Sequence, residues 1–203
     1  DFYTEVLGLK IINQTDTFVS FEIGRSILEI HFKATTTPYH FAINIPCNKD
    51  REALEWLRSK VEILKDGKNE IQDFNSWNAK AIYFYDKDKN IVELIARKNL
   101  NNASNKDFGI DQFVEISEIG LGTTDIEKEF RFLNNHTGIE IFDGGFDRFC
   151  AIVDENGLFI FINKKVKDWF PTNDKVFSSE FLIQFIERGK QYQVDYNNNA
   201  LKF

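Results

Sequence analysis

The stretch YFYDKDKNIVEL at residues 83–94 decides how this chain folds, because it predicts two strands joined by a short polar loop. Strand-forming aromatic and branched residues fill its two ends, and turn-forming residues fill positions 86–90. Side chains alternate between the two faces of a strand, so Glu93 shares one face with Ile91 and Ile95. An acid among isoleucines is costly unless something compensates its charge, and a metal ion is one such partner.

An earlier stretch repeats this strand pattern. SILEIHF at 26–32 resembles NIVELIA at 90–96, and each carries a glutamate near its middle, Glu29 in the first and Glu93 in the second. A lone histidine, His40, opens the strand predicted between them. We therefore treat Glu29, His40 and Glu93 as candidate site residues. The plain alternatives are a solvated strand acid for each glutamate and a structural role for the histidine.

The pattern that follows His40 predicts one complete structural unit. Its order is a strand, a helix and three further strands, expected at 40–45, 51–61, 63–65, 77–85 and 91–97. The preceding segment predicts a helix and three strands, expected at 2–8, 10–15, 17–23 and 26–32. This is the same β-α-β-β-β unit without its first strand, and we expect that strand to be missing from the chain as given.

Two further copies are predicted after a polar stretch. The third copy has strands at 115–122, 151–153 and 158–162 and a helix at 125–135, and the segment 181–203 is a degenerate fourth copy built of strands. The fold class is therefore α+β, with repeated β-α-β-β-β modules. We expect paired modules at 1–98, a linker at 99–112, and structural third and fourth modules at 113–203.

Composition argues against several classes of protein. Asp and Glu number 32 against 25 Lys and Arg, and the net charge of −7 disfavours binding to nucleic acid or to an anionic membrane. No apolar run approaches the roughly 20 residues that span a bilayer. Cys47 and Cys150 are too few for a disulfide framework. We therefore expect a cytoplasmic protein that binds neither nucleic acid nor a membrane.

Two phrases resemble the vicinal oxygen chelate superfamily, which includes glyoxalase I, bleomycin- and fosfomycin-resistance proteins and extradiol dioxygenases. FYTEVLGL at 2–9 is similar to the superfamily's Phe-Tyr…Leu-Gly-Leu phrase. The hairpin at 83–94 is similar to its Tyr-Phe-x-Asp-Pro-Asp-Gly-Asn-x-x-Glu-Leu phrase, with Lys87 and Lys89 in place of the turn residues Pro and Gly. The resemblance covers residues 1 to about 98 well and implies a glyoxalase/dioxygenase-like fold.

The resemblance also implies a divalent metal held by up to four side chains from two paired modules. Carried over by position, the ligands are Glu29, His40 and Glu93, and the fourth falls on the missing strand. One imidazole and two carboxylates suit Zn, Ni, Mn or Fe and do not decide among them. Glu29 or Glu93 could leave the metal to carry a proton, so both are candidate catalytic residues. His31 could replace Glu29 as a ligand, although a hydrogen-bonding role beside the ligands fits it better.

The third module departs from this ligand pattern. Glu118 stands where His40 stands in the second module, and Phe161 stands where Glu93 stands. A module without the nitrogen ligand and the terminal carboxylate is a poor metal site. This is why we expect the second half of the chain to be structural.

The resemblance thus implies a metal-dependent enzyme whose small-molecule substrate chelates the ion through two neighbouring oxygens. A glyoxalase-like lyase, an extradiol-type dioxygenase and a thiol transferase all remain open. The alternative is a metal-free protein of the bleomycin-resistance type that sequesters an antibiotic or aromatic molecule. A descendant that keeps only the fold is a third possibility, and both a monomer and a homodimer are open.

Overall fold

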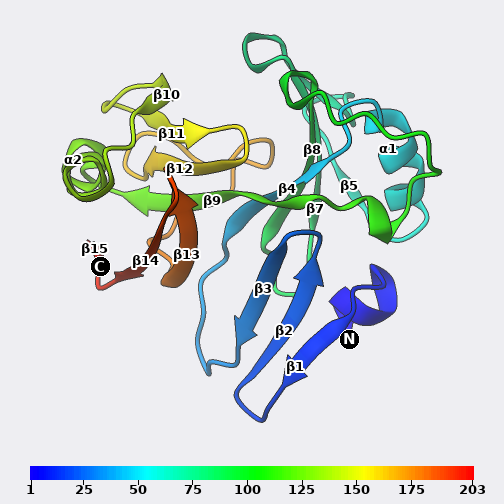
Figure 1. Ribbon diagram of the computed structural model, residues 1–203, viewed down its shortest axis with the longest axis horizontal. Helices are drawn as coiled ribbons and strands as arrows, with labels where there is room; N and C mark the ends of the chain where they lie inside the picture. The colour runs from blue at the N-terminus through cyan, green and yellow to red at the C-terminus, as the bar shows by residue number, and fades with distance from the viewer. The chain divides into compact units, whose positions relative to one another are not determined.

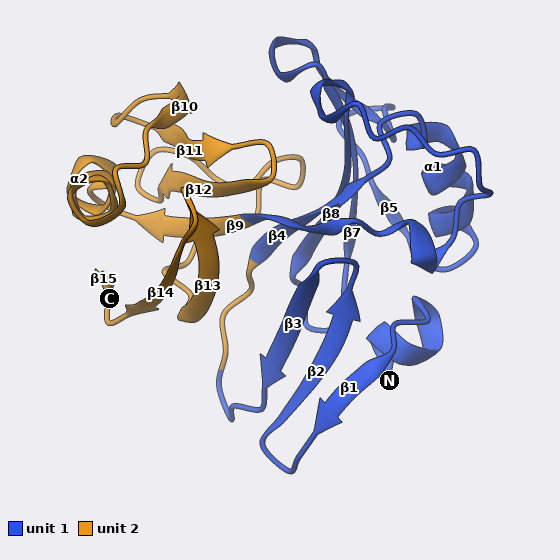
Figure 2. Ribbon diagram, in the orientation of Figure 1, with its two compact units in different colours: residues 1–35, 40–118 blue, residues 36–39, 119–203 orange.

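The computed structural model describes all residues, 1–203, as two compact units (Figure 2). The first unit comprises residues 1–35 and 40–118, and the second comprises residues 36–39 and 119–203. Strand β9, Glu115–Thr123, begins in the first unit and ends in the second.

The first unit contains one complete module. Its elements are β4 (His40–Ile45), α1 (Asp50–Arg58), β5 (Ile63–Leu64), β7 (Ala79–Tyr85) and β8 (Ile91–Arg97). The strands lie in the order β4-β8-β7-β5, and β6 (Gln72–Phe74) also pairs with β7. Because β4 and β8 run parallel, the chain needs a crossover, and α1 provides the helical part of it. The predicted helix and strands of this module are present, while the three-residue β6 was not expected.

Helix α1 forms because its apolar residues recur at helical spacing. Ala53, Leu54 and Leu57 are buried, and the helix contacts β7 and β8 (Figure 1). Every residue of β4 and β8 is buried, so both faces of these strands are covered by protein. Polar residues on these strands therefore lie in the interior.

The second unit contains a module of the same order. The rest of β9 is followed by α2 (Ile126–Thr137), β10 (Ile141–Gly144), β11 (Phe149–Asp154) and β12 (Gly157–Asn163). The strand order β10-β11-β12-β9 again places the first strand of the module beside its last. Gly138 ends α2 with a φ of 74°, a left-handed conformation that suits glycine. Phe161 is fully buried in the apolar core of this unit.

Two smaller sheets complete the chain. In the first unit, the helical turn η1 (Phe2–Val6) precedes the antiparallel strands β1 (Ile11–Gln14), β2 (Phe18–Ile23) and β3 (Ser26–His31). In the second unit, β13 (Phe181–Glu187), β14 (Lys190–Asn197) and β15 (Ala200–Lys202) form a three-stranded sheet. Short helical turns lie at Asn75–Trp77, Lys98–Leu100 and Ile110–Gln112, the last two at the ends of the segment expected to be a linker.

The predicted α+β class is confirmed, and so is its construction from repeated modules. The expectation that a first strand is missing concerns residues outside this chain and stays a prediction. None of the helices has both the length and the apolar character that crossing a membrane requires.

Candidate metal centre

Three titratable side chains of the first unit converge in its interior. His40, Glu93 and Glu118 are 6%, 2% and 5% exposed. His40 Nε2 lies 3.5 Å from Glu93 Oε2 and 3.7 Å from Glu118 Oε2. One donor atom from each residue lies within 4.8 Å of the other two. These three residues form the candidate metal centre, and we call them the His40 cluster.

Strand order explains why they meet. In the parallel pairing of β4 with β8, Ala42 lies opposite Glu93. His40 is two residues before Ala42, so it lies on the same face of the sheet as Glu93. Strand β9 lies on the other side of β4, and the Val114 amide just before it donates to the Asn44 carbonyl. His40 therefore has one acid on each side.

The other ring nitrogen of His40 fixes which nitrogen faces the acids. Nδ1 lies 3.1 Å from the carbonyl oxygen of Ile91. A carbonyl oxygen only accepts hydrogen bonds, so Nδ1 carries the proton of the neutral ring. The lone pair is then on Nε2, which is turned toward Glu93 and Glu118. Metal-binding histidines typically have this arrangement.

Glu118 is held by a buried arginine. Arg97, which is fully buried, donates from Nη2 to Glu118 Oε1, while the Oε2 atom of Glu118 faces His40. Arg97 Nε donates to Asn44 Oδ1 at 3.2 Å, and its guanidinium carbon lies 5.5 Å from the centroid of the Trp77 ring. Each oxygen of the Glu118 carboxylate therefore has a separate neighbour.

A second layer of contacts fixes Asn44. Its Nδ2 donates to Glu115 Oε1 at 3.1 Å. Glu115 Oε2 accepts from Arg25 Nη2 at 2.5 Å. The amide of Asn44 cannot turn without losing the bond to Glu115 or the bond to Arg97, so the arginine is held from both sides.

Burial also controls the charge of Glu93. Loss of water around its carboxyl raises its pKa well above the ordinary value, and the negative charge of Glu118 raises it further. Arg97 and the hydroxyl of Tyr83, which bonds to Glu93, act in the opposite direction but do not cancel the rise. Without a cation, the protonated form of Glu93 is therefore favoured.

The donor set fits a divalent cation. When both glutamates ionise to act as ligands and the imidazole is neutral, the two carboxylates and the Arg97 guanidinium carry one net negative charge, which a cation would compensate. Two ligand atoms at about 2.1 Å from one ion in tetrahedral geometry are separated by about 3.4 Å. The distances of 3.5 and 3.7 Å from His40 Nε2 are close to that separation. The ligand types suit Zn, Ni, Mn or Fe and leave the identity open.

The structure brings together two of the three residues proposed from the sequence. His40 and Glu93 are in the His40 cluster, but Glu29 lies on β3 in the sheet β1-β2-β3. Glu29 accepts from Ser20 Oγ at 2.9 Å and lies 2.7 Å from His31 Nε2, on a partly exposed surface. His31 therefore does lie beside Glu29, in that sheet.

Glu118 belongs to the His40 cluster but was not predicted as a ligand. Its match to His40 in the repeat was noted, but we paired the first module with the second. In the structure, β4 of the second module lies beside β9 of the third. One signal in the sequence could have identified it. The first strands of the second and third modules carry potential metal ligands, His40 and Glu118, at the same position of the repeat. Arg97 gave no signal beyond ending a strand.

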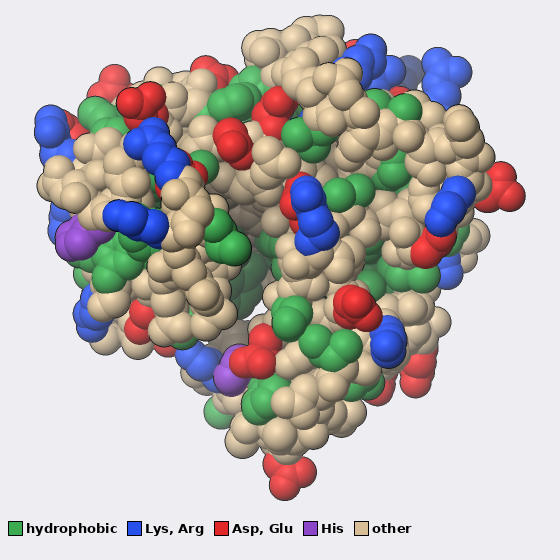
Figure 3. Space-filling model, in the orientation of Figure 1, with side chains coloured by type: hydrophobic (Ala, Val, Ile, Leu, Met, Phe, Trp, Pro, Cys, Tyr) green, Lys and Arg blue, Asp and Glu red, His purple; other side chains and the backbone are tan.

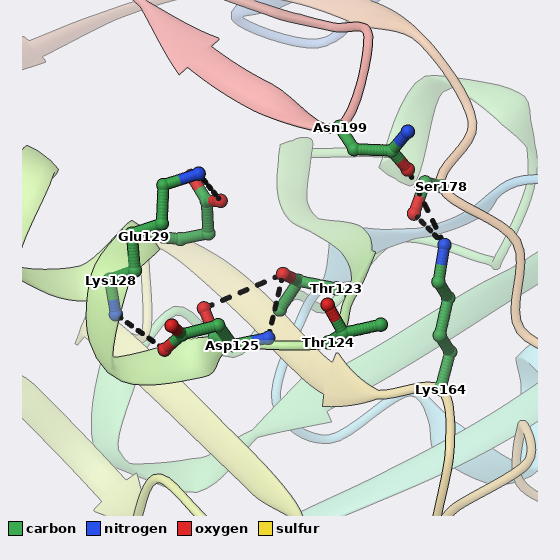
Figure 4. A pocket seen from close by; sticks show the side chains of 8 residues that line it. All are labelled: Thr123, Thr124, Asp125, Lys128, Glu129, Lys164, Ser178 and Asn199. Carbon is green, nitrogen blue, oxygen red and sulfur yellow. Dashed lines mark hydrogen bonds and ion pairs between the residues drawn. The ribbon is translucent and has the colours of Figure 1, made fainter.

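A cavity of about 480 Å³ lies in the second unit, and no residue of the His40 cluster lines it (Figure 4). Its lining is polar and consists of Thr123, Thr124, Asp125, Lys128, Glu129, Lys164, Ser178 and Asn199. Asp125 already caps α2 by accepting from the Lys128 amide, and Lys164 donates to Ser178. Two acids and two lysines balance one another, so the lining favours neither sign of ligand.

On the face shown in Figure 3, basic and acidic side chains are interspersed.

The chain is similar to solved structures of dioxygenase and glyoxalase proteins. It matches a proposed dioxygenase from Bacillus subtilis subsp. subtilis str. 168 with a TM-score of 0.59 and 18% identity, over 80% of this chain and 58% of that one. It matches glyoxalase I from Zea mays with a TM-score of 0.52 and 16% identity, over 79% and 60% of the two chains. A point mutant of the Zea mays enzyme gives a TM-score of 0.53 at 16% identity, over 82% and 64%.

These likenesses concern the fold alone, because the identities are low. The chain spans less than two thirds of the length of each of these structures. No protein-family model and no curated protein matches the sequence. The chain has a glyoxalase/dioxygenase-like fold, which confirms the fold that the resemblance of the hairpin at 83–94 implied.

Proposed function

We propose that this protein is a metal-dependent enzyme that acts on a small substrate with two neighbouring oxygens. His40, Glu93 and Glu118 would hold the divalent ion. The observation that carries the proposal is their convergence within 4.8 Å, with the imidazole fixed in the tautomer that presents Nε2. The fold, shared with glyoxalase I and a proposed dioxygenase, agrees with this assignment.

Each residue of the His40 cluster has a distinct part in this proposal. A bound ion would act as a Lewis acid on the two substrate oxygens. His40 offers Nε2, and Glu118 offers Oε2 while Arg97 retains Oε1. Glu93 is the proton carrier in this proposal, because its carboxyl lies beside His40 Nε2 and, once it leaves the ion, its burial raises its pKa and favours uptake of a proton. Glu29 is held by Ser20 and His31 in another sheet, so Glu93 is the better supported of the two proposed catalytic acids.

The reaction class stays open between a glyoxalase-like lyase and an extradiol-type dioxygenase. Both use a metal-bound pair of neighbouring oxygens, and this ligand set serves either. Proton transfer by Glu93 fits the lyase class. The fold is compatible with both reaction classes, so identifying the substrate is what would distinguish the lyase from the dioxygenase.

Metal analysis tests the proposal. We expect protein purified without chelator to hold about one divalent ion per chain, measured by inductively coupled plasma mass spectrometry. His40→Ala and Glu118→Gln should each lose the ion while keeping the circular dichroism spectrum. Glu29→Gln is the matched control and should keep it. Retention of the ion by both cluster variants contradicts the assignment.

One observation favours a second function, that of a metal-free protein that binds a small molecule. Without a cation the protonated form of Glu93 is favoured and Arg97 balances the charge of Glu118, so the buried group needs no metal to be neutral. The His40 cluster would then be a structural ion network. Protein that stays metal-free after incubation with Zn²⁺, Ni²⁺, Mn²⁺ and Fe²⁺ in turn supports this function over the enzyme.

A further inference from the structure

We propose that Arg97 makes the metal-loaded site prefer an anionic chelator over a neutral one. This inference rests on the proposed function and adds the charge of the substrate to it. It predicts a small carboxylate with a neighbouring hydroxyl or keto oxygen, that is, a 2-hydroxy or 2-oxo acid.

The first argument is the charge of the loaded site. When both glutamates are ligands of the ion and therefore ionised, Glu93, Glu118 and Arg97 together carry one net negative charge. A divalent cation turns this into one net positive charge. None of these residues is more than 6% exposed, so water does little to screen the surplus. A monoanionic ligand removes the surplus charge, and a neutral ligand leaves it in place.

The second argument is an unused donor on the same arginine. Arg97 Nε donates to Asn44, and Nη2 donates to Glu118. Its Nη1 is buried and has no hydrogen-bond partner. A buried guanidinium nitrogen without an acceptor is costly. A carboxylate oxygen is the acceptor that a guanidinium matches best.

The third argument is that the arginine is already oriented. Asn44 is fixed by Glu115, and the guanidinium lies against the Trp77 ring. Its Nη1 is part of the same rigid planar group as Nη2, which contacts a residue of the His40 cluster. A ligand held by both the ion and Nη1 therefore needs little reorganisation of Arg97.

A purely structural role for Arg97, as counterion of Glu118, would use the same contacts. The two roles differ in what they do to ligand choice. Loss of a structural counterion weakens the binding of charged and neutral chelators alike. Loss of an anion-binding group changes the ratio between them.

Glycolate and glycolamide test the difference, because each has two neighbouring oxygens and they differ in charge. The Co²⁺-loaded protein is titrated with each ligand, and the visible absorption bands of the ion report binding. The variants are Arg97→Met and Arg97→Lys, with Arg51→Met on the exposed side of α1 as the matched control. Arg97→Lys keeps the positive charge and can still pair with Glu118. It therefore provides a folded variant for the test if Arg97→Met does not fold.

We expect the preference for glycolate to fall by about tenfold or more in Arg97→Met and to fall measurably in Arg97→Lys, whose single nitrogen is engaged by Glu118. Arg51→Met should keep the wild-type ratio. A ratio within twofold of wild type in every folded Arg97 variant overturns the inference and leaves the metal site intact. If the wild-type protein takes up no Co²⁺ or Zn²⁺, the proposed function itself fails, and this inference fails with it.

Discussion

His40 Nδ1 lies 3.1 Å from the carbonyl oxygen of Ile91, a residue of the strand that pairs in parallel with the strand of His40. This one contact ties the chemistry of the His40 cluster to the topology of the module. The register that pairs His40 with Ile91 also places Glu93 on the same face. The sheet that forms the module thus orients the nitrogen ligand and supplies one of its acids.

Binding of a divalent ion should stabilise the fold. The cation removes the electrostatic cost of two adjacent buried carboxylates. Free Zn²⁺ at 100 times its dissociation constant should add about 2.7 kcal/mol to the free energy of unfolding, measured by thermal melts with and without chelator. Glu118→Gln should lose most of the increase, and Glu29→Gln should keep it. An equal increase in wild type and Glu118→Gln would place the ion elsewhere.

Arg97 and Glu118 should be strongly coupled in a double-mutant cycle. Arg97→Met leaves a buried carboxylate without its counterion, and we expect a loss of about 3–5 kcal/mol in urea unfolding. The double variant Arg97→Met with Glu118→Gln should cost less than the sum of the single changes, by more than about 1 kcal/mol.

An exposed ion pair provides the comparison. Arg131 pairs with Glu127 on the surface of α2, and Arg131→Met should cost less than about 0.5 kcal/mol. Additive effects at Arg97 and Glu118 would show that their contact contributes little to stability.

Stability of the metal-free protein should depend on pH through Glu93. Its pKa is raised in the folded state, so the folded protein holds this proton more tightly than the unfolded chain. The stability it contributes is complete below the ordinary glutamate pKa and is lost as the pH rises through the raised value. Glu93→Gln should therefore become more stable relative to wild type as the pH increases above about 4.5, measured in urea with chelator present. A difference that stays constant from pH 5 to 8 would contradict the assigned direction.

Local pattern was enough to predict most strands and both α-helices. Residues 91–97 are mostly apolar and follow a polar loop, and this stretch forms β8. The pairing of modules could not be predicted in the same way. All the modules share one sequence pattern, so the pattern does not show which two modules place their edge strands side by side. Glu118 was missed for this reason. The partners of the ligands, Arg97 and Tyr83, come from strand register, which no local pattern reveals.

The two cysteines should differ sharply in reactivity. Cys150 is fully buried in the core of the second unit, and burial, with a smaller effect of Asp143, raises its pKa to about 11. At pH 8 only about one thousandth of such a thiol is ionised. With Ellman's reagent, the partly exposed Cys47 should therefore react first, and Cys150 should react only on unfolding. Cys47→Ser should remove the fast phase and Cys150→Ser should leave it, whereas a fast phase that survives in Cys47→Ser would mean that Cys150 is accessible in the folded protein.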